Sequence, residues 1–206
     1  PARLEVPALL LKRAFDLVVA SIMLLISLPL FALIAVAIKL DSPGPVLYRA
    51  RRVGLGGQIF EMWKFRSMTV DAEAREAELA HLNLYSGGTF KVRNDPRVTR
   101  VGRILRRTSL DELPQLFNVL VGEMSLVGPR PALVSDLERY EPHHFERLSV
   151  IPGITGAWQV GGRNLITDFE TIFRLDRSYI RRWSLLLDIK ILVRTLKVVI
   201  TGEGAY

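Results

Sequence analysis

Two adjacent carboxylates, Asp111 and Glu112, lie just after a segment that is rich in arginine. Residues 91–107 contain one acid and seven cations: Lys91, Arg93, Arg97, Arg100, Arg103, Arg106 and Arg107. Guanidinium groups match phosphate oxygens bidentately, and carboxylate oxygens are common ligands of Mg²⁺. The pair therefore favours a site that handles an anion together with a divalent cation.

A carboxylate can also attack phosphorus and form an acyl phosphate, which divides one difficult displacement into two. The attack brings two anions together, and unit charges about 4 Å apart repel by about 4 kcal/mol at an effective dielectric constant of 20. Nearby cations have to offset this repulsion. We expect Arg130, held rigidly between two prolines, and Lys64 and Arg66, at the end of a predicted hairpin, to bind phosphate.

A structural alternative explains the same pair without chemistry. Ser109 and Glu112 have the spacing of a capping box, in which each side chain binds a backbone N–H of the first helical turn. In a second version Asp111 caps the helix, and Pro114 lies in its first turn. Acids at a helix N-terminus gain only about 0.3–1 kcal/mol from the helix dipole. The local pattern leaves both explanations open, and the arginines favour the site.

Composition narrows the class of protein. A chain of 206 residues is long enough for one domain with a sizeable core. Its formal charge of +7 implies a polyanionic partner, which is nucleic acid, an acidic membrane surface or a phosphorylated substrate. The absence of cysteine excludes disulfides and thiolate metal sites. The three histidines (His81, His143 and His144) lack metal-ligand spacing, and we expect them at the surface.

Residues 17–38 form an uncharged segment of 22 residues, enough for a helix to cross a hydrocarbon core about 30 Å thick. Pro29 predicts a break or a kink at residues 27–29. Both flanks are basic, which places both ends on the cytoplasmic side; they contain Lys12, Arg13, Lys39, Arg49, Arg51 and Arg52. A re-entrant helix that leaves by the face it entered fits both facts, and an ordinary kinked transmembrane helix stays open.

Residues 183–201 form a second apolar stretch with a narrow polar stripe. Lys190, Arg194, Lys197 and Thr201 recur at helical spacing along this stripe. Such a helix suits the membrane interface, where each basic residue near an anionic leaflet adds about 1 kcal/mol of attraction. A core helix with a solvated edge is the alternative.

The other elements indicate an α+β fold that is mainly helical with a small β-hairpin. We predict hairpin strands at residues 46–52 and 58–65, joined by a glycine-rich turn, after an exit loop at residues 41–45. Helices are predicted at residues 69–82 (acidic), 97–107 (basic) and 113–121 (apolar), and a last helical stretch begins at about Asp168. We divide the chain into a re-entrant membrane helix (residues 1–40) and a catalytic domain packed on the membrane interface (residues 41–206).

Several ordered motifs carry a specific resemblance. SLDELPQ at residues 109–115, followed by MSLVGPRP at residues 124–131, resembles the bacterial sugar transferase family, the monotopic polyprenyl-phosphate phosphoglycosyl transferases. The likeness extends to KRAFD at residues 12–16, WKFRSM at 63–68, PGITG at 152–156, LDRSY at 175–179 and GAY at 204–206. The resemblance therefore runs from about residue 11 to the end of the chain.

The resemblance implies transfer of a sugar 1-phosphate from a UDP-sugar to undecaprenyl phosphate or another polyprenyl phosphate, with release of UMP. Asp111 is then the nucleophile that carries the phosphosugar, and Glu112 binds Mg²⁺. Lys64, Arg106, Arg130 and Asp176 match positions that line the family's active site. The catalytic part would lie at the cytoplasmic face of the bacterial inner membrane, against anionic lipid, and would initiate polysaccharide or glycoconjugate synthesis.

Two features depart from the family pattern. Ile151 stands where the family often carries a basic residue, so it offers no cationic contact to nucleotide or sugar. The chain starts without methionine, and larger relatives carry an extra N-terminal membrane domain, so we expect a catalytic portion of a longer protein. Glucose or galactose is the first expectation for the sugar, N-acetylated sugars stay open, and a homodimer is compatible with the sequence.

Two other classes of function compete with the enzyme. One is a non-catalytic peripheral membrane protein that binds anionic lipid through basic helices. The other is a membrane-tethered nucleic-acid binder, which only the positive charge favours because no recognisable DNA- or RNA-binding motif occurs. Neither class has a use for paired carboxylates among arginines, so we predict an enzyme with no nucleic-acid partner.

Overall fold

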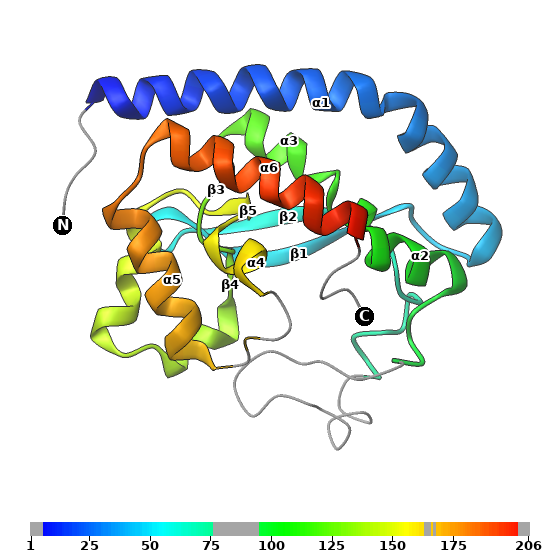
Figure 1. Ribbon diagram of the computed structural model, residues 1–206. Helices are drawn as coiled ribbons and strands as arrows, with labels where there is room; N and C mark the ends of the chain where they lie inside the picture. The colour runs from blue at the N-terminus through cyan, green and yellow to red at the C-terminus, as the bar shows by residue number, and fades with distance from the viewer. Residues whose placement is uncertain (1–5, 76–94, 163–165, 167, 202–206) are drawn as a thin grey trace.

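The computed structural model describes residues 6–75, 95–162, 166 and 168–201. It begins with α1 (Val6–Asp41), a helix of 36 residues that runs along the upper edge of the molecule in Figure 1, with the other elements below it. The helix is not interrupted at residues 27–29, where the sequence predicted a break. Its second half bends instead (Figure 1), and Pro29 supplies the physical reason because it removes a helical hydrogen bond.

Most of α1 does not pack against the rest of the molecule. Only Asp16, Ala20, Ile34 and Ile38 are buried in it, and its most apolar stretch is almost entirely exposed. It is also the one helix among the described residues that is long and apolar enough to cross a membrane. A membrane protein is the class that fits such a surface, while the re-entrant path and the division at residue 40 stay predictions.

The predicted hairpin is confirmed. β1 (Leu47–Val53) and β2 (Ile59–Phe65) pair antiparallel, and a short 3₁₀ turn, η1 (Leu55–Gly57), connects them. Gly56 and Gly57 have φ values of 64° and 85°, which explains the glycines of this turn. β4 (Ala132–Leu133) adds to the other edge of β1, so the sheet has the order β2-β1-β4.

Two of the three helices predicted between the hairpin and residue 121, the basic one and the apolar one, are also present, with shifted bounds. They are α2 (Arg100–Thr108) and α3 (Gln115–Val121), and the single 3₁₀ turn η3 (Leu110–Glu112) lies between them. Residues 70–75 form turns, so the described start of the predicted acidic helix at 69–82 is not helical. The rest of that predicted helix lies outside the described residues.

A second, two-stranded sheet was not predicted. β3 (Ser125–Val127) pairs in parallel with β5 (Gly153–Thr155). The remaining elements are η4 (Val134–Arg139), η5 (Pro142–Ser149), α4 (Ala157–Gly161), α5 (Phe169–Arg181) and α6 (Leu185–Thr201). Asp168 caps α5 through a hydrogen bond from the Thr171 N–H, which confirms the predicted start of this last helical stretch.

The main core lies between the hairpin, α3 and β3. Buried apolar side chains from all three, such as Met62, Leu116 and Leu126, form one cluster with α5 and α6. Buried Asn118 fixes α3 against β2, because it accepts a hydrogen bond from the Trp63 N–H and donates one to the Glu61 carbonyl. This packing holds η3, with Asp111 and Glu112, beside β2.

Candidate active site

Asp111 and Glu112 lie on η3, where the chain reverses between α2 and α3. Ser109 ends α2 with a left-handed backbone (φ 57°), and its side chain makes no N-cap hydrogen bond. The N-cap position of α3 is Pro114, whose side chain has no hydrogen-bonding group and so cannot cap the helix. Both capping explanations are therefore wrong: Ser109 and Glu112 form no capping box, and Asp111 does not cap α3.

The Glu112 carboxylate is held between two cations from distant parts of the chain. Lys64 Nζ lies 3.1 Å from Glu112 Oε1, and Arg130 Nη2 lies 2.8 Å from the same oxygen. Burial alone would raise the pKa of Glu112, but Arg130 and Lys64 outweigh it and hold this pKa well below its usual range. Glu112 in turn raises the pKa of Arg130. Glu112 and Arg130 therefore both stay charged.

Asp111 is in a different environment although it is the next residue. It is 8% exposed and forms no ion pair with the described residues. Burial raises the pKa of Asp111, and Glu112 raises it further, whereas Lys64, Arg106 and Arg130 lower it. The predicted cations Lys64, Arg106 and Arg130 thus all act on this one carboxylate.

The loop that carries Arg130 is fixed by close backbone packing. Gly128 N–H donates to the Thr155 carbonyl (2.9 Å), and Gly153 N–H donates to the Pro129 carbonyl (2.9 Å). A Cβ on Gly153 would lie 2.1 Å from the Gly128 nitrogen, so only glycine permits this approach. The motifs at residues 124–131 and 152–156 therefore form one rigid unit behind Arg130.

Asp176, predicted to bind substrate, lies behind this unit. Its carboxylate accepts from Arg147 Nε at 2.9 Å, and Arg147 Nη2 donates to the Arg130 carbonyl at 3.2 Å. Arg147 also donates to the Tyr140 hydroxyl at 2.7 Å. Burial raises the pKa of Asp176 to about 6 although Arg147 lowers it. Asp176 is 1% exposed, so the structure makes it the counter-ion of Arg147 and connects it to Arg130 through that residue.

The family model of bacterial sugar transferases matches residues 7–202 of this chain, which include every residue of the candidate site described above. The chain belongs to the bacterial sugar transferase family. It is 49% identical over 197 residues to the galactosyl transferase CpsE of Streptococcus agalactiae, covering 96% of this chain and 44% of that protein.

Two further relatives of this family member differ in length. This chain is 45% identical over 204 residues to the UDP-glucose:undecaprenyl-phosphate glucose-1-phosphate transferase of Escherichia coli (96% of this chain, 42% of that protein). It is 43% identical over 199 residues to the exopolysaccharide production protein ExoY of Rhizobium meliloti (95% of this chain, 88% of that protein). The chain therefore spans less than half of CpsE and of the Escherichia coli protein, and most of ExoY.

Arg66 was also predicted to bind phosphate, but the fold of this protein does not bring it to Glu112. Its guanidinium donates to the carbonyls of Ser42 and Pro43, at the exit of α1. Burial lowers the pKa of Arg66, and Asp41 is the carboxylate that raises it. Arg66 thus fastens the loop between α1 and β1, and a substrate contact from it stays a prediction.

Arg52 is a cation of the site that the sequence did not single out. Its side chain is half-buried, and the charges acting on it include those of Arg130 and Glu112. In the sequence it stood out only as one of several basic residues after the apolar segment. The strand alternation of the hairpin could have placed it, because Arg52 and Lys64 lie on one face of the β1–β2 pair.

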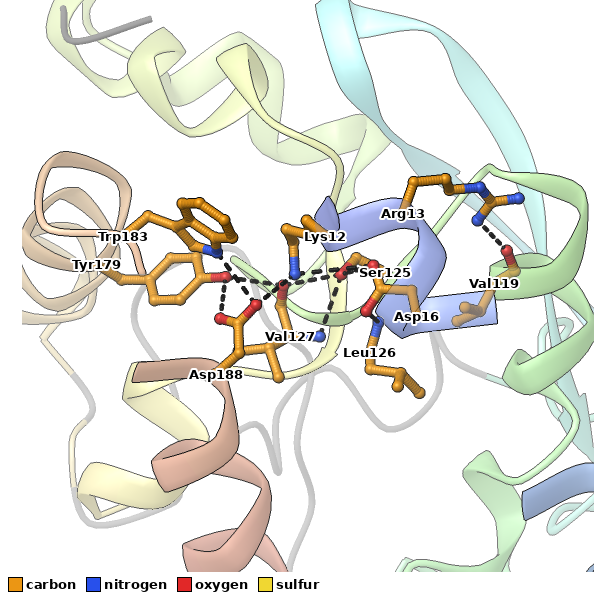
Figure 2. A network of polar contacts seen from close by, with 10 residues as sticks. All are labelled: Lys12, Arg13, Asp16, Val119, Ser125, Leu126, Val127, Tyr179, Trp183 and Asp188. Carbon is orange, nitrogen blue, oxygen red and sulfur yellow. Dashed lines mark hydrogen bonds and ion pairs between the residues drawn. The ribbon is translucent and has the colours of Figure 1, made fainter. Parts of the chain in front are cut away.

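Figure 2 shows a second polar network, which fastens α1 to β3 and α6. Lys12 Nζ lies 2.7 Å from Asp188 Oδ2 and 3.7 Å from Asp16 Oδ2. Asp16 accepts a hydrogen bond from the Ser125 hydroxyl at 2.7 Å. The Tyr179 hydroxyl lies 2.7 Å from Asp188 Oδ1, and Trp183 Nε1 donates to Asp188 at 3.0 Å. The network holds the strand that leads directly into the Arg130 loop.

One histidine that was predicted at the surface, His144, is buried. His143 is exposed, whereas His144 is buried beside Glu170, and the ligand atoms of these three lie within 4.8 Å of one another. His144 Nδ1 accepts a hydrogen bond from the Glu141 N–H, so the proton of the neutral ring is on Nε2, which faces Glu170. This tautomer leaves His144 no lone pair for a metal ion. His81 lies outside the described residues.

Proposed function

We propose that this protein transfers a sugar 1-phosphate from a UDP-sugar to undecaprenyl phosphate, or to a related polyprenyl phosphate, and releases UMP. One observation carries the proposal: Asp111 is buried without an ion pair to any residue that the structure describes, beside a Glu112 that two cations hold. Two relatives support it, because one is named a galactosyl transferase and the name of the other contains UDP-glucose and undecaprenyl phosphate.

In the first step an oxygen of Asp111 attacks the β-phosphorus of the UDP-sugar. An acyl phosphate bond to Asp111 forms, the bond between this phosphorus and the bridging oxygen breaks, and UMP leaves with that oxygen. The attack requires the carboxylate form. Lys64, Arg106 and Arg130 lower the pKa of Asp111 and so favour this form against burial. The same cations offset the repulsion between carboxylate and phosphate.

In the second step an oxygen of the polyprenyl phosphate attacks the phosphorus of the acyl phosphate. The bond to Asp111 breaks, and the Asp111 carboxylate is regenerated together with polyprenyl diphosphate sugar. Both steps displace an oxygen at one phosphorus, so one set of cations serves both. Asp111 is buried where Lys64, Arg106 and Arg130 act on it, so it is placed to carry the phosphosugar between the two steps. This placement supports a covalent intermediate.

The residues present fit Mg²⁺. Glu112 Oε1 receives both short contacts from Lys64 and Arg130, whereas among the described residues Oε2 has only a 3.5 Å contact, from Arg130 Nη1. Oε2 therefore keeps lone pairs for a hard cation, which proteins usually bind through one or two carboxylates plus substrate phosphates. Bound there, Mg²⁺ would neutralise charge on the diphosphate. The depressed pKa of Glu112 keeps that carboxylate ionised for this role.

The packing of α1 supports a monotopic protein at the cytoplasmic face of the inner membrane. Asp16 and Ala20, near its start, and Ile34 and Ile38, near its end, are all buried against the body of the molecule. A helix that crosses a bilayer once cannot present both ends to one body on one side. We therefore propose the re-entrant path, with a bend in place of the predicted break.

The exposed side of α6 supports contact with anionic lipid. Lys190, Arg194 and Lys197 are exposed, and so are the neighbouring apolar residues Leu186, Ile189, Val193 and Leu196. This combination suits a helix that lies in the interface of an anionic membrane. The alternative, a core helix with a solvated edge, does not explain four exposed large apolar side chains.

Purified protein mixed with Mg²⁺, undecaprenyl phosphate and a panel of UDP-sugars tests the proposal. We expect UMP release with UDP-glucose or UDP-galactose, and N-acetylated sugars belong in the panel. Asp111→Asn should abolish turnover and also the mass increase that a phosphosugar adduct gives when the lipid acceptor is withheld. Glu112→Gln should lose most activity together with its Mg²⁺ dependence.

Glu138→Gln is the matched control, because Glu138 is an exposed carboxylate remote from η3 in sequence, and we expect it to retain wild-type activity. Absence of UMP release with every sugar would refute the enzyme and favour a lipid-binding protein without catalysis. Near-normal turnover of Asp111→Asn would remove Asp111 from the nucleophile role.

A further inference from the structure

Arg52 and Lys64 lie on one face of the hairpin, at opposite ends of the β1–β2 pair. Arg52 pairs with Phe60 in the register, and Lys64 pairs with Tyr48. The residues between them on this face, such as Met62, are buried in the core. Two cations thus border one apolar surface, and the Lys64 end of it lies against Glu112.

β4 brings the Arg130 loop to the Arg52 end of the same strand. Arg52 pairs with Leu133, and Val53 pairs with Ala132, which follows Arg130 by two residues. Arg130 Nη2 is bound to Glu112 at 2.8 Å, and its Nη1 lies 3.5 Å from the other oxygen of that carboxylate. Arg130 therefore binds Glu112 from a loop that leads into the strand paired with Arg52, and its charge acts on Arg52. A guanidinium has five N–H donors, more than these two contacts use.

Arg52 has no counter-ion of its own among the described residues. It forms no ion pair with them, and its buried Nε has no hydrogen-bond acceptor. Burial, and after it Arg130, lower the pKa of Arg52 to about 10, although Asp136 and Glu112 act to raise it. Asp136 already accepts the Leu133 N–H at the start of η4. A half-buried guanidinium without a counter-ion is stabilised when an anion binds to it.

We propose that Arg52 and Arg130 form a second phosphate subsite next to the Glu112 site. The inference rests on the proposed function, which requires a donor with two linked phosphates and an acceptor with one. One phosphate has to lie at Asp111, so a neighbouring subsite suits the phosphate that leaves with UMP. The acceptor phosphate has the same chemistry, and kinetics can separate the two.

The test compares Arg52→Gln with Arg52→Lys and with Arg51→Gln. Arg51 is the matched control because it is the next residue on β1, is exposed and points to the opposite face. KM for the UDP-sugar and KM for undecaprenyl phosphate are measured separately, together with inhibition by UMP. For Arg52→Gln we expect KM for the UDP-sugar and the UMP inhibition constant to rise about 10- to 100-fold, as for loss of a charged hydrogen bond.

The other variants fix the interpretation. Arg52→Lys should show a smaller rise in these constants than Arg52→Gln, because lysine keeps the positive charge but lacks the two parallel N–H donors of the guanidinium group. Arg51→Gln should match wild type. A rise in KM for undecaprenyl phosphate alone would keep the subsite and assign it to the acceptor. Unchanged KM values in a folded, active Arg52→Gln protein would overturn the inference. A wild-type protein that releases no UMP would instead refute the proposed function.

Thermal stabilisation by UMP gives a readout that does not depend on turnover. Wild type and Arg51→Gln should be stabilised by UMP, and Arg52→Gln should require about 10- to 100-fold more UMP for the same shift. Equal UMP dependence in all three proteins, together with an unchanged KM for undecaprenyl phosphate, would show that Arg52 serves the fold alone.

Discussion

Asp111 and Glu112 are neighbours in the chain with opposite electrostatic environments. Glu112 has two cationic partners, which hold its pKa low, whereas burial raises the pKa of Asp111. Two carboxylates whose pKa values are pushed apart in this way suit different roles in one reaction. The low pKa of Glu112 fits the proposed ligand of Mg²⁺. Asp111, which is buried and forms no ion pair within the described part of the chain, fits the proposed nucleophile.

Asp176 gives a pH-dependent prediction. Burial raises the pKa of Asp176 from 3.8 to about 6, so the folded protein binds this proton more tightly than the unfolded chain. The stability that this group contributes is therefore fully present below its unfolded pKa and is lost as pH rises through about 6. The total is about 3 kcal/mol. Relative to Asp176→Asn, wild type should lose about this much unfolding free energy between pH 4 and 7 in urea titrations.

Asp168 is the matched control for this slope. Hydrogen bonds from Thr171 lower the pKa of Asp168, so its contribution to stability is present above the unfolded pKa and is lost as pH falls. The difference between wild type and Asp168→Asn should therefore change in the opposite direction. Parallel slopes for the two variants would contradict the protonation of buried Asp176.

The site residues differ in how far the sequence could predict them. Lys64, Arg106 and Arg130 were predicted, because a cluster of cations near paired carboxylates is visible in the chain and in the family motifs. Arg66 and Asp176 stand within the same motifs but take structural partners, which only tertiary packing decides. Arg52 was missed because its link to Arg130 depends on β4, a strand of two residues with no periodic pattern.

At the scale of elements, the network in Figure 2 connects three of them through buried charges. Lys12 on α1 is the cation for Asp16 on the same helix and for Asp188 on α6, and both carboxylates are almost fully buried. Ser125 of β3 completes the network through Asp16. The position of the membrane helix is thereby tied to the strand that precedes Arg130.

Lys12→Met should loosen this connection. The change leaves two buried carboxylates without a cation, and breaking a buried pair in this way costs about 3–5 kcal/mol. For a chain of this length the melting temperature should fall by about 6–20 °C in detergent. Turnover should fall as well, because β3 leads into the Arg130 loop.

A double-variant cycle separates this effect from simple loss of packing. Asp188→Asn added to Lys12→Met should cost less than the sum of the two single changes, since the groups are in direct contact. Lys39→Met, at the exposed end of α1, is the control and should leave the melting temperature unchanged. Additive costs for Lys12 and Asp188 would show that the 2.7 Å contact contributes nothing as a pair.

Elements with a local signal were predicted, and those that depend on distant partners were not. The hairpin, α2, α3 and the start of α5 follow from alternation, helical spacing and a capping aspartate. The β3–β5 ladder joins residues 28 positions apart through strands of three residues each, too short to show a period. The sequence predicted a break where α1 only bends. Pro29 removes one helical hydrogen bond, and the sequence does not show whether the surrounding residues keep the helix continuous.

At the scale of the whole molecule, the exposed apolar surface and the positive charge require a common explanation. Large apolar side chains are exposed along α1 and α6, and the chain carries a net charge of +7. A monotopic protein seated on an anionic leaflet accounts for both, because the apolar helices enter the membrane and basic residues face its headgroups. In the proposed topology both ends of α1 lie on the cytoplasmic side.

Single cysteines at the two ends of α1 test this topology. The chain has no cysteine, so Leu9→Cys and Leu40→Cys each supply one label site, and both leucines are exposed, at 50% and 84%. In intact spheroplasts a membrane-impermeant maleimide should modify neither residue, and after lysis it should modify both. Glu138→Cys, on the exposed surface of η4, serves as the cytoplasmic reference. Labelling of either end of α1 before lysis would show that the helix crosses the membrane once, and its packing against one body would then need another explanation.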